Sequence, residues 1–313
     1  MAVYVIRRLV STIAIMAIVG IFIFLLLRLA PGDPAAVMAG RNAAPQMIAN
    51  IREQLGLNEP LPVQFIHWAW DMLRGDFGMS IFSGWPVLGL ISQRVEPTVS
   101  LAVMTLILSV SVGVTFGILA AWRAGRLVDL ALTAFSALGY SVPVFVVGYF
   151  FIYVFAIRTQ LLPVQGYVSI EQGIGPWFVH LILPTVALSL PYVAFIARIV
   201  RASMLEVLSE DYMRTAAAKG ASSYAMLFHH ALKNAGAPIL TVIGLSFAYL
   251  IGGVVITETV FNVPGVGRLV VDAITSRDYP VIQGVLILVS GLYVLINLAV
   301  DLSYTLIDPR IRY

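Results

Sequence analysis

Long apolar runs separated by short polar segments dominate this chain. Six runs are close to the ~20 residues that a helix needs to cross a bilayer. They cover residues 9–29, 97–121, 130–157, 178–198, 239–257 and 281–307. The runs are apolar on all faces and lack the alternation of a membrane β-barrel. Because a spanning segment must satisfy its own backbone hydrogen bonds, we expect an all-α polytopic fold with six transmembrane helices.

The first run follows a short basic stretch, as the apolar part of a secretory signal peptide does. The run from Leu9 to Leu27 is nevertheless long enough to span, and no small-residue cleavage site follows it. We therefore expect this run to be retained as the first transmembrane helix.

Lysine and arginine residues are unequally divided between the two sides of the predicted bundle. With the N-terminus inside, the inner segments hold Arg7, Arg8, Arg123, Arg126, Arg198, Arg201, Arg214, Lys219, Lys233, Arg310 and Arg312. The shorter outer loops hold only Arg158, Arg268 and Arg277. The excess of basic residues in cytoplasmic segments of membrane proteins therefore predicts that both termini are cytoplasmic.

Composition supports a membrane protein and excludes several other classes. Hydrophobic residues make up 60% of the 313 residues and charged residues only 11%, whereas soluble domains carry about 25% charged residues. The absence of cysteine excludes disulfides and thiolate sites. The net charge of +3 is small and gives no reason to expect a nucleic-acid partner.

Two outer loops are too long to be simple turns. The loop 30–96 predicts short helices over 45–57 and 62–73, and its tryptophans and phenylalanines are typical of a membrane interface. It is either a membrane-surface cap or a partner-binding element. The second loop, 258–280, has an amphipathic stretch that ends near Ile274.

The inner segment 202–238 has the pattern of two helices joined by a glycine turn. Apolar residues recur at helical spacing over 204–219, at Leu205, Leu208, Tyr212 and Ala216. Gly220 can take the left-handed conformation that ends a helix, and Ser222 or Ser223 can cap the next one. That second helix carries Met226, Leu227, His230 and Asn234.

Motifs for catalysis and nucleotide binding are missing. Neither Lys219 nor Lys233, the only lysines, follows a phosphate-binding glycine loop. His229 and His230 are adjacent and point to different faces of a helix, so we expect no shared metal. The spans carry almost no ionisable groups, which disfavours a proton-coupled carrier. The chain is thus predicted to be non-catalytic, with no cofactor of its own.

The inner segment also carries a resemblance to a known family. Residues 211–220, Asp-Tyr-Met-Arg-Thr-Ala-Ala-Ala-Lys-Gly, resemble the EAA loop of ABC importer permeases, and more narrowly of the dipeptide/oligopeptide/nickel family (DppB/OppB type). Similar motifs run along nearly the whole chain, at residues 31–34, 55–57, 75–80, 162–167, 183–185, 258–261, 264–269, 277–280 and 308–313. The chain departs from the family pattern where Thr215 or Ala216 stands near the first Glu of the triplet.

This resemblance implies a type I ABC importer permease in the bacterial inner membrane. It implies as partners a homologous second permease, two cytoplasmic ATPase subunits that bind ATP and Mg, and a periplasmic substrate-binding protein. The implied function is import of dipeptides, oligopeptides or glutathione-like peptides by alternating access. Residues implied to couple to the ATPase are Tyr212, Arg214, Ala216, Ala218, Lys219, Gly220, Leu227, His230 and Asn234. The alternative interpretation of the segment is an amphipathic interfacial helix pair whose cations face lipid phosphates.

The chain divides, on this interpretation, into residues 1–96, with the first span and its long periplasmic loop, and residues 97–313, a permease core of five helices. Polar residues that are candidates for the translocation path are Tyr140, Ser141, Ser246, Tyr249, Glu258 and Asn297. For each, a helix–helix contact is an equally good alternative, and for Glu258 a structural ion pair.

Other functions remain open at the level of the sequence. They are a permease for nickel complexes or another small solute, an autonomous channel or secondary carrier, and a membrane scaffold. The first differs from peptide import only in its ligand. The other two need no ATPase subunits.

Overall fold

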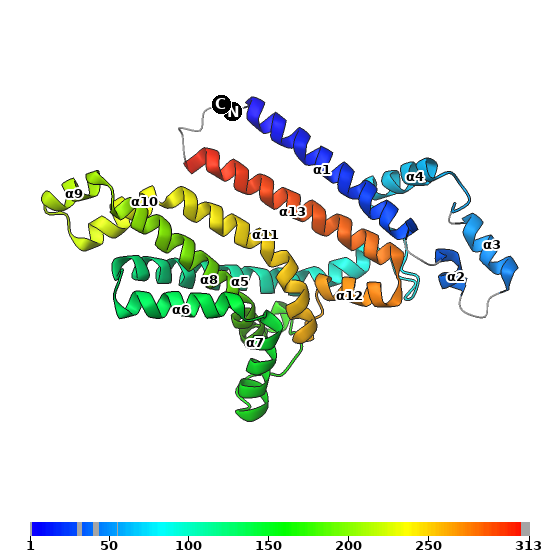
Figure 1. Cartoon of the computed structure of the whole chain (residues 1–313). Helices are drawn as coiled ribbons and strands as arrows, with labels where there is room; N and C mark the ends of the chain where they lie inside the picture. The colour runs from blue at the N-terminus through cyan, green and yellow to red at the C-terminus, as the bar shows by residue number, and fades with distance from the viewer. Residues whose placement is uncertain (1, 30–32, 40–43, 55, 308–313) are drawn as a thin grey trace. The chain divides into compact units, whose positions relative to one another are not determined.

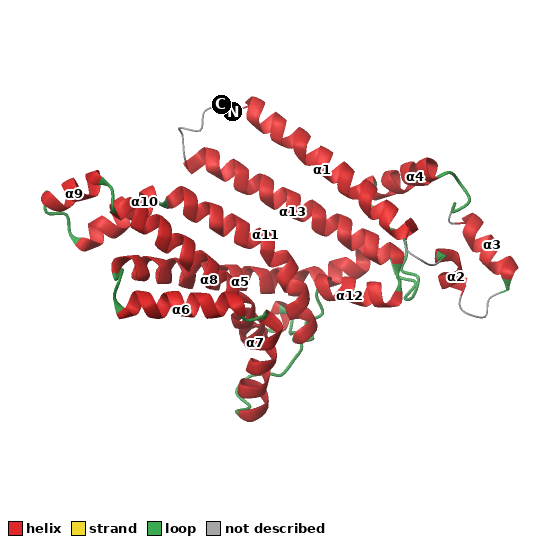
Figure 2. Cartoon of the chain, in the orientation of Figure 1, coloured by secondary structure: helices red, strands yellow, loops and turns green. Residues whose placement is uncertain are grey.

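The computed structural model describes residues 2–29, 33–39, 44–54 and 56–307. Within these residues every regular element is a helix (Figures 1 and 2). The contacts divide the chain into two compact units. We call residues 97–264 with 296–307 the core unit, and residues 2–96 with 265–295 the N-terminal unit. The motif residues Pro31, Gly32, Leu55 and 308–313, with Arg310 and Arg312, lie outside the described residues.

Five helices in the described part of the chain are long and apolar enough to cross a membrane, or six if the two parts of a bent pair count as one span. The five are α1 Ala2–Leu29, α5 Val87–Trp122, α8 Ile174–Leu208, α11 Gly236–Val260 and α13 Tyr279–Ile307. The prediction that the apolar runs form helices is confirmed. Both α5 and α8 extend well beyond the apolar runs that predicted them.

The third apolar run differs from the single helix expected over 130–157. Val142 is extended, with φ −86° and ψ 124°, and it directly precedes Pro143. A proline disfavours helical geometry at the preceding residue and lacks an N–H to continue the helix. The two parts of the run therefore meet at 99°. They are α6 Leu127–Ser141 and α7 Val144–Phe151, which continues as the π-helix η1 Ile152–Arg158.

Helix α8 lies at the centre of the core unit. It contacts α6, α7 and α11, and α5 approaches it through two glycines (Figure 1). A Cβ atom placed on Gly117 would lie 2.5 Å from Val200 Cβ and 2.8 Å from the Ala197 carbonyl oxygen. Gly113 faces Ile196 in the same way. Small residues at such contacts let two membrane helices approach closely and gain packing energy.

In the N-terminal unit, the short helix α4 Leu61–Leu73 packs against α1. The ring of Phe24 contacts those of Phe65, at 5.3 Å between centroids, and Trp68, at 5.6 Å. Arg28 Nε donates to Gln64 Oε1 at 3.0 Å. The short helices predicted in this loop are confirmed as α4 and as α3 Pro45–Gln54, with α2 Pro34–Ala39 preceding them.

A buried carboxylate ties the end of the long loop to the turn before α13. Asp278 accepts hydrogen bonds from Ser80 Oγ at 2.5 Å and from the Ile81 backbone N–H at 3.2 Å. The amphipathic stretch predicted after residue 264 is α12 Val266–Ser276. These contacts are among those that place residues 265–295 in the same compact unit as residues 2–96. The sequence-based division at residue 96 assigns 265–295 to the permease core.

The contact between α5 and α8 gives a stability test. We expect Gly117→Ala to lower the free energy of unfolding by about 1–3 kcal/mol, because the added methyl group overpacks a contact with backbone on the far side. The melting temperature of the purified protein in detergent measures this change. Gly252→Ala in α11 is the control, since its Cβ meets nothing within 4 Å. Equal melting temperatures for the two variants would contradict the close contact.

Candidate functional site

The inner segment 202–238, which we call the coupling segment, begins as the last turns of α8. The single helix expected over 204–219 is broken. Ser209 Oγ donates to the backbone carbonyl three residues earlier at 2.7 Å, a local bond that competes with helix continuation. Glu210 is then extended, with ψ 147°, and α9 starts afresh at Asp211–Ala218.

The glycine turn has the predicted geometry. Gly220 has φ +86°, a conformation that costs glycine little and other residues more. The Ser222 hydroxyl accepts a hydrogen bond from the Ala225 N–H at 3.2 Å. The second helix begins there as the π-helix η3 Ala225–Ala231 and ends as α10 Leu232–Asn234. Ser222 is therefore the capping residue.

A methionine holds the coupling segment onto the core unit. Met213 is 1% exposed and belongs to the same hydrophobic cluster as Met204 and Leu227. Tyr212, which the spacing placed on the apolar face, is 43% exposed. Its hydroxyl accepts from Asn234 Nδ2 at 3.0 Å and so joins α9 to α10. The break at Ser209 shifts the helical phase, which is why Met213 rather than Tyr212 is buried.

The turn and the two helices form a concave surface around a space of about 480 Å³. It is lined by Tyr212, Thr215, Ala216, Lys219, Gly220, Ala221 and His230. Five of the nine predicted coupling residues thus lie together. No atom lies within 4 Å of the position that a Cβ on Gly220 would take, so the turn is open to an approaching backbone.

The other four predicted coupling residues lie around this surface. Arg214 pairs with Asp211 at 3.3 Å, with both side chains almost fully exposed, and such pairs add little stability. Ala218 is exposed at the end of α9. Leu227 is buried, and Asn234 donates a hydrogen bond to the Tyr212 hydroxyl. Both residues therefore stabilise the concave surface without lining it. The coupling role of all nine stays a prediction.

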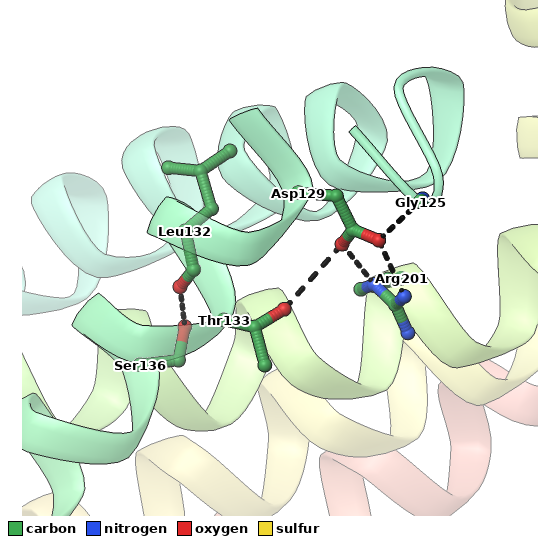
Figure 3. A network of polar contacts seen from close by, with 6 residues as sticks. All are labelled: Gly125, Asp129, Leu132, Thr133, Ser136 and Arg201. Carbon is green, nitrogen blue, oxygen red and sulfur yellow. Dashed lines mark hydrogen bonds and ion pairs between the residues drawn. The ribbon is translucent and has the colours of Figure 1, made fainter. Parts of the chain in front are cut away.

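A network of polar contacts joins α6 to α8 next to the coupling segment (Figure 3). Arg201 Nε donates to Asp129 Oδ1 at 2.5 Å, and Arg201 Nη2 donates to Oδ2 at 2.7 Å. The Gly125 N–H donates to Asp129 Oδ2 at 3.0 Å, and the Thr133 hydroxyl to Oδ1 at 3.4 Å. The Asp129 side chain is 7% exposed and that of Arg201 is 32% exposed. A two-pronged pair of this kind fixes both position and angle between the helices.

Sequence reasoning missed this pair. Asp129 lies in the first turn of α6, where a carboxylate suits the helix dipole. The place of Asp129 at the start of a helix can be read from the sequence. Its pairing with Arg201, 72 residues later, cannot be predicted from any local pattern. Arg201 counted only as one of the inner basic residues.

The candidate path residues fall into two groups. Tyr140 and Ser141 line a cavity of about 400 Å³ between α5, α6 and α8. Tyr249 is exposed on α11, and Asn297 is partly buried in α13. These four remain candidates for a path.

The other two candidates are buried. The Ser246 hydroxyl donates to the Val242 carbonyl at 2.7 Å, a bond within α11. Glu258 is 0% exposed and accepts from the Thr98 hydroxyl at 2.6 Å, which joins α11 to α5. In this conformation both act as structural contacts, and a role in the path requires that they become exposed in another conformation.

The adjacent histidines have different surroundings. The His229 ring contacts Tyr224 at 6.1 Å between centroids, whereas His230 lines the concave surface. Within the described residues, no three His, Cys, Asp or Glu side chains lie close enough together to hold a metal ion.

The sequence matches a known family of membrane transport proteins. Residues 113–313 match the family described as "Binding-protein-dependent transport system inner membrane component". Residues 1–113 match the family described as "Binding-prot-dependent transport system membrane comp, N-term". The chain belongs to this transport family. It is therefore a multi-pass inner-membrane permease.

Curated relatives align over the full length of the permease. It is 78% identical over 313 residues to "Probable peptide ABC transporter permease protein y4tP" of Sinorhizobium fredii, with 100% of both chains covered. It is 43% identical over 311 residues to "Glutathione transport system permease protein GsiC" of Escherichia coli strain K12, with 99% of both covered. It is 40% identical over 313 residues to "Putative peptide transport system permease protein BAB2_1050" of Brucella abortus, with 100% of both covered.

A solved structure shares the fold. A chain of the MetNI methionine ABC transporter in an inward-facing conformation superimposes with a TM-score of 0.56 at 18% identity. The match covers 71% of the permease and 97% of that chain. The prediction of an ABC importer permease fold is confirmed. The orientation of the termini stays a prediction.

The Asp129–Arg201 pair gives a second stability test. We expect Asp129→Asn to lower the free energy of unfolding by about 1–3 kcal/mol, because it weakens two charge-assisted hydrogen bonds and leaves the partly exposed Arg201 without a carboxylate partner. Combining it with Arg201→Gln should cost less than the sum of the single changes, because the two residues interact directly. Thermal unfolding of the four proteins in detergent gives the interaction energy.

Asp211→Asn is the matched control for this cycle. It removes the carboxylate from the Asp211–Arg214 ion pair, in which both side chains are exposed. We therefore expect no measurable change in stability. Strictly additive effects of Asp129→Asn and Arg201→Gln would contradict a stabilising role for the buried pair.

Proposed function

We propose that this permease imports peptides across the inner membrane as one of two homologous permease subunits of an ABC transporter. The observation that carries the proposal is the full-length similarity to relatives named as peptide and glutathione permeases. Glutathione is itself a tripeptide, so both names describe one ligand class. A periplasmic binding protein delivers the peptide, and alternating inward- and outward-open states move it across.

The energy for this cycle comes from two cytoplasmic ATPase subunits, which bind ATP and Mg. The concave surface around Gly220 supports docking of an ATPase at the coupling segment. Met213 packs α9 against the hydrophobic cluster that includes Met204 of α8. A displacement of α9 would therefore be transmitted to this membrane helix. Rigid elements of this kind are needed to carry displacement between distant sites.

Peptide uptake tests the proposed function directly. We expect uptake of a labelled dipeptide or tripeptide by reconstituted transporter to require the permease, its partner permease, the ATPase subunits and the binding protein together. Omission of the ATPase subunits should reduce uptake to background, because the permease has no energy source of its own. Uptake by the permease alone in liposomes would show an autonomous carrier instead.

The glycine turn tests the coupling role. We expect Gly220→Val to lower peptide-stimulated ATP hydrolysis and uptake about tenfold, since left-handed geometry costs a β-branched residue about 1–2 kcal/mol and 1.4 kcal/mol is a factor of ten. The amount of protein in the membrane should stay unchanged. Hydrolysis and uptake rates in proteoliposomes measure the effect.

Two further variants separate coupling from strain. Gly220→Asn should retain most activity, because asparagine tolerates the left-handed region. Gly84→Val introduces comparable strain at φ +66°, also with nothing near its Cβ, but in the N-terminal unit. If Gly84→Val uncouples the ATPase as strongly as Gly220→Val, general strain and not docking explains the loss.

A further inference from the structure

The cavity between α5, α6 and α8 exists because alanines line all three helices. A cavity of about 400 Å³ lies in the range of small-ligand pockets, about 300–1,000 Å³. The alanines that leave this space open are Ala120, Ala137, Ala194, Ala197 and Ala202. Space of this size beside charged groups, and walled by membrane helices, is suited to a small polar molecule.

Two arginines one helical turn apart enter this cavity from α8, and their electrostatic states differ. Arg201 is neutralised by the two-pronged contact to Asp129. Arg198 is exposed, and among the described residues its guanidinium carbon lies 5.8 Å from the centre of the Tyr140 ring. A cation without a carboxylate partner near a membrane span is a candidate functional group.

The wall opposite these arginines carries hydroxyl groups from one face of α6. Thr133, Ser136 and Tyr140 follow each other at helical spacing, Ser141 is next to Tyr140, and all four line the cavity. Ser136 and Ser141 donate their protons to carbonyls four residues earlier, at 2.9 and 2.7 Å. Their oxygens can therefore only accept further hydrogen bonds. The cavity thus offers acceptors on α6 and a cationic donor on α8.

We infer that this cavity binds the terminal carboxylate of a peptide in transit, with Arg198 as its counter-charge. This inference rests on the proposed function. A peptide supplies the complementary groups: a carboxylate for the guanidinium, and N–H donors for the hydroxyl oxygens. Guanidinium and carboxylate match in geometry and can form two parallel hydrogen bonds. Tyr140 positions the guanidinium from one side.

A lipid phosphate is the other anion within reach of Arg198. The hydroxyl oxygens of α6 favour the peptide, because they can accept hydrogen bonds from its backbone N–H groups, whereas the phosphate group of a lipid offers only acceptor oxygens. The lipid is therefore an outcome to be distinguished by the test.

The test uses the complete transporter, with its partner permease, ATPases and binding protein, in proteoliposomes. The probes are a labelled peptide that the wild-type complex imports and the same peptide with a C-terminal amide, both at saturating binding protein. We expect Arg198→Gln to slow import of the free acid about tenfold and that of the amide less than twofold. Arg198→Lys should restore part of the preference for the acid.

Arg158→Gln is the matched control, since it removes an arginine that also lies 5.8 Å from a tyrosine ring, that of Tyr153, outside the cavity. It should leave the ratio of acid to amide import unchanged. An equal fall for both peptides in Arg198→Gln overturns the inference. So does a fall that depends on phosphatidylglycerol in the vesicles, which would assign Arg198 to lipid. If the wild-type complex imports no peptide at all, the proposed function fails as well.

Occupancy of the cavity can be measured without relying on the preference of the binding protein. The chain has no cysteine, so Ser136→Cys places its only thiol in the cavity wall. We expect the free-acid peptide to slow maleimide labelling of this thiol about fivefold, the amide to have little effect, and Arg198→Gln to remove the protection. Ser223→Cys in the coupling segment is the unprotected control. Equal protection by acid and amide overturns the role of Arg198.

Discussion

Helix α8 is the element on which the other helices of the core unit pack. Because the bilayer provides no hydrophobic drive between helices, association depends on close van der Waals contact. Gly113 and Gly117 allow that contact on α5, and Gly139 on α6 lies close to the Leu190 carbonyl. The same helix continues to Leu208. Pro184 and Pro191 lie within this helix, so the stretch without a proline that leads from Leu208 into the membrane is the one that contacts Gly113 and Gly117.

The pair of Asp129 and Arg201 lies where this continuity matters most. Asp129 lies in the first turn of α6, and Arg201 is the last charged residue before the coupling segment. Two parallel hydrogen bonds between a guanidinium and a carboxylate resist both sliding and rotation. Helices α6 and α8 are therefore constrained to move together at this end. The cavity begins at this pair and continues along the same two helices to Tyr140.

Hydropathy predicted the membrane helices well, because length and apolarity are local properties of the chain. The Gly220 turn and the Ser222 cap were also predictable, since each depends on one residue and its neighbours. The bend at Val142–Pro143 carried a local signal that averaged hydropathy conceals. The burial of Met213 and the pairing of Asp129 depend on contacts between distant residues. No local pattern contains that information.

The cavity and the coupling segment are connected by the two arginines of α8. Arg201 is paired with Asp129 through two hydrogen bonds. Its charge is therefore neutralised, and its role is to hold α8 in position against α6. Arg198, one turn away, keeps its charge available because no carboxylate competes for it within the described residues. The close approach of Gly139 to the Leu190 carbonyl also holds α6 near α8 beside the cavity. One arginine therefore fixes the two helices, and the other is left to bind the anion.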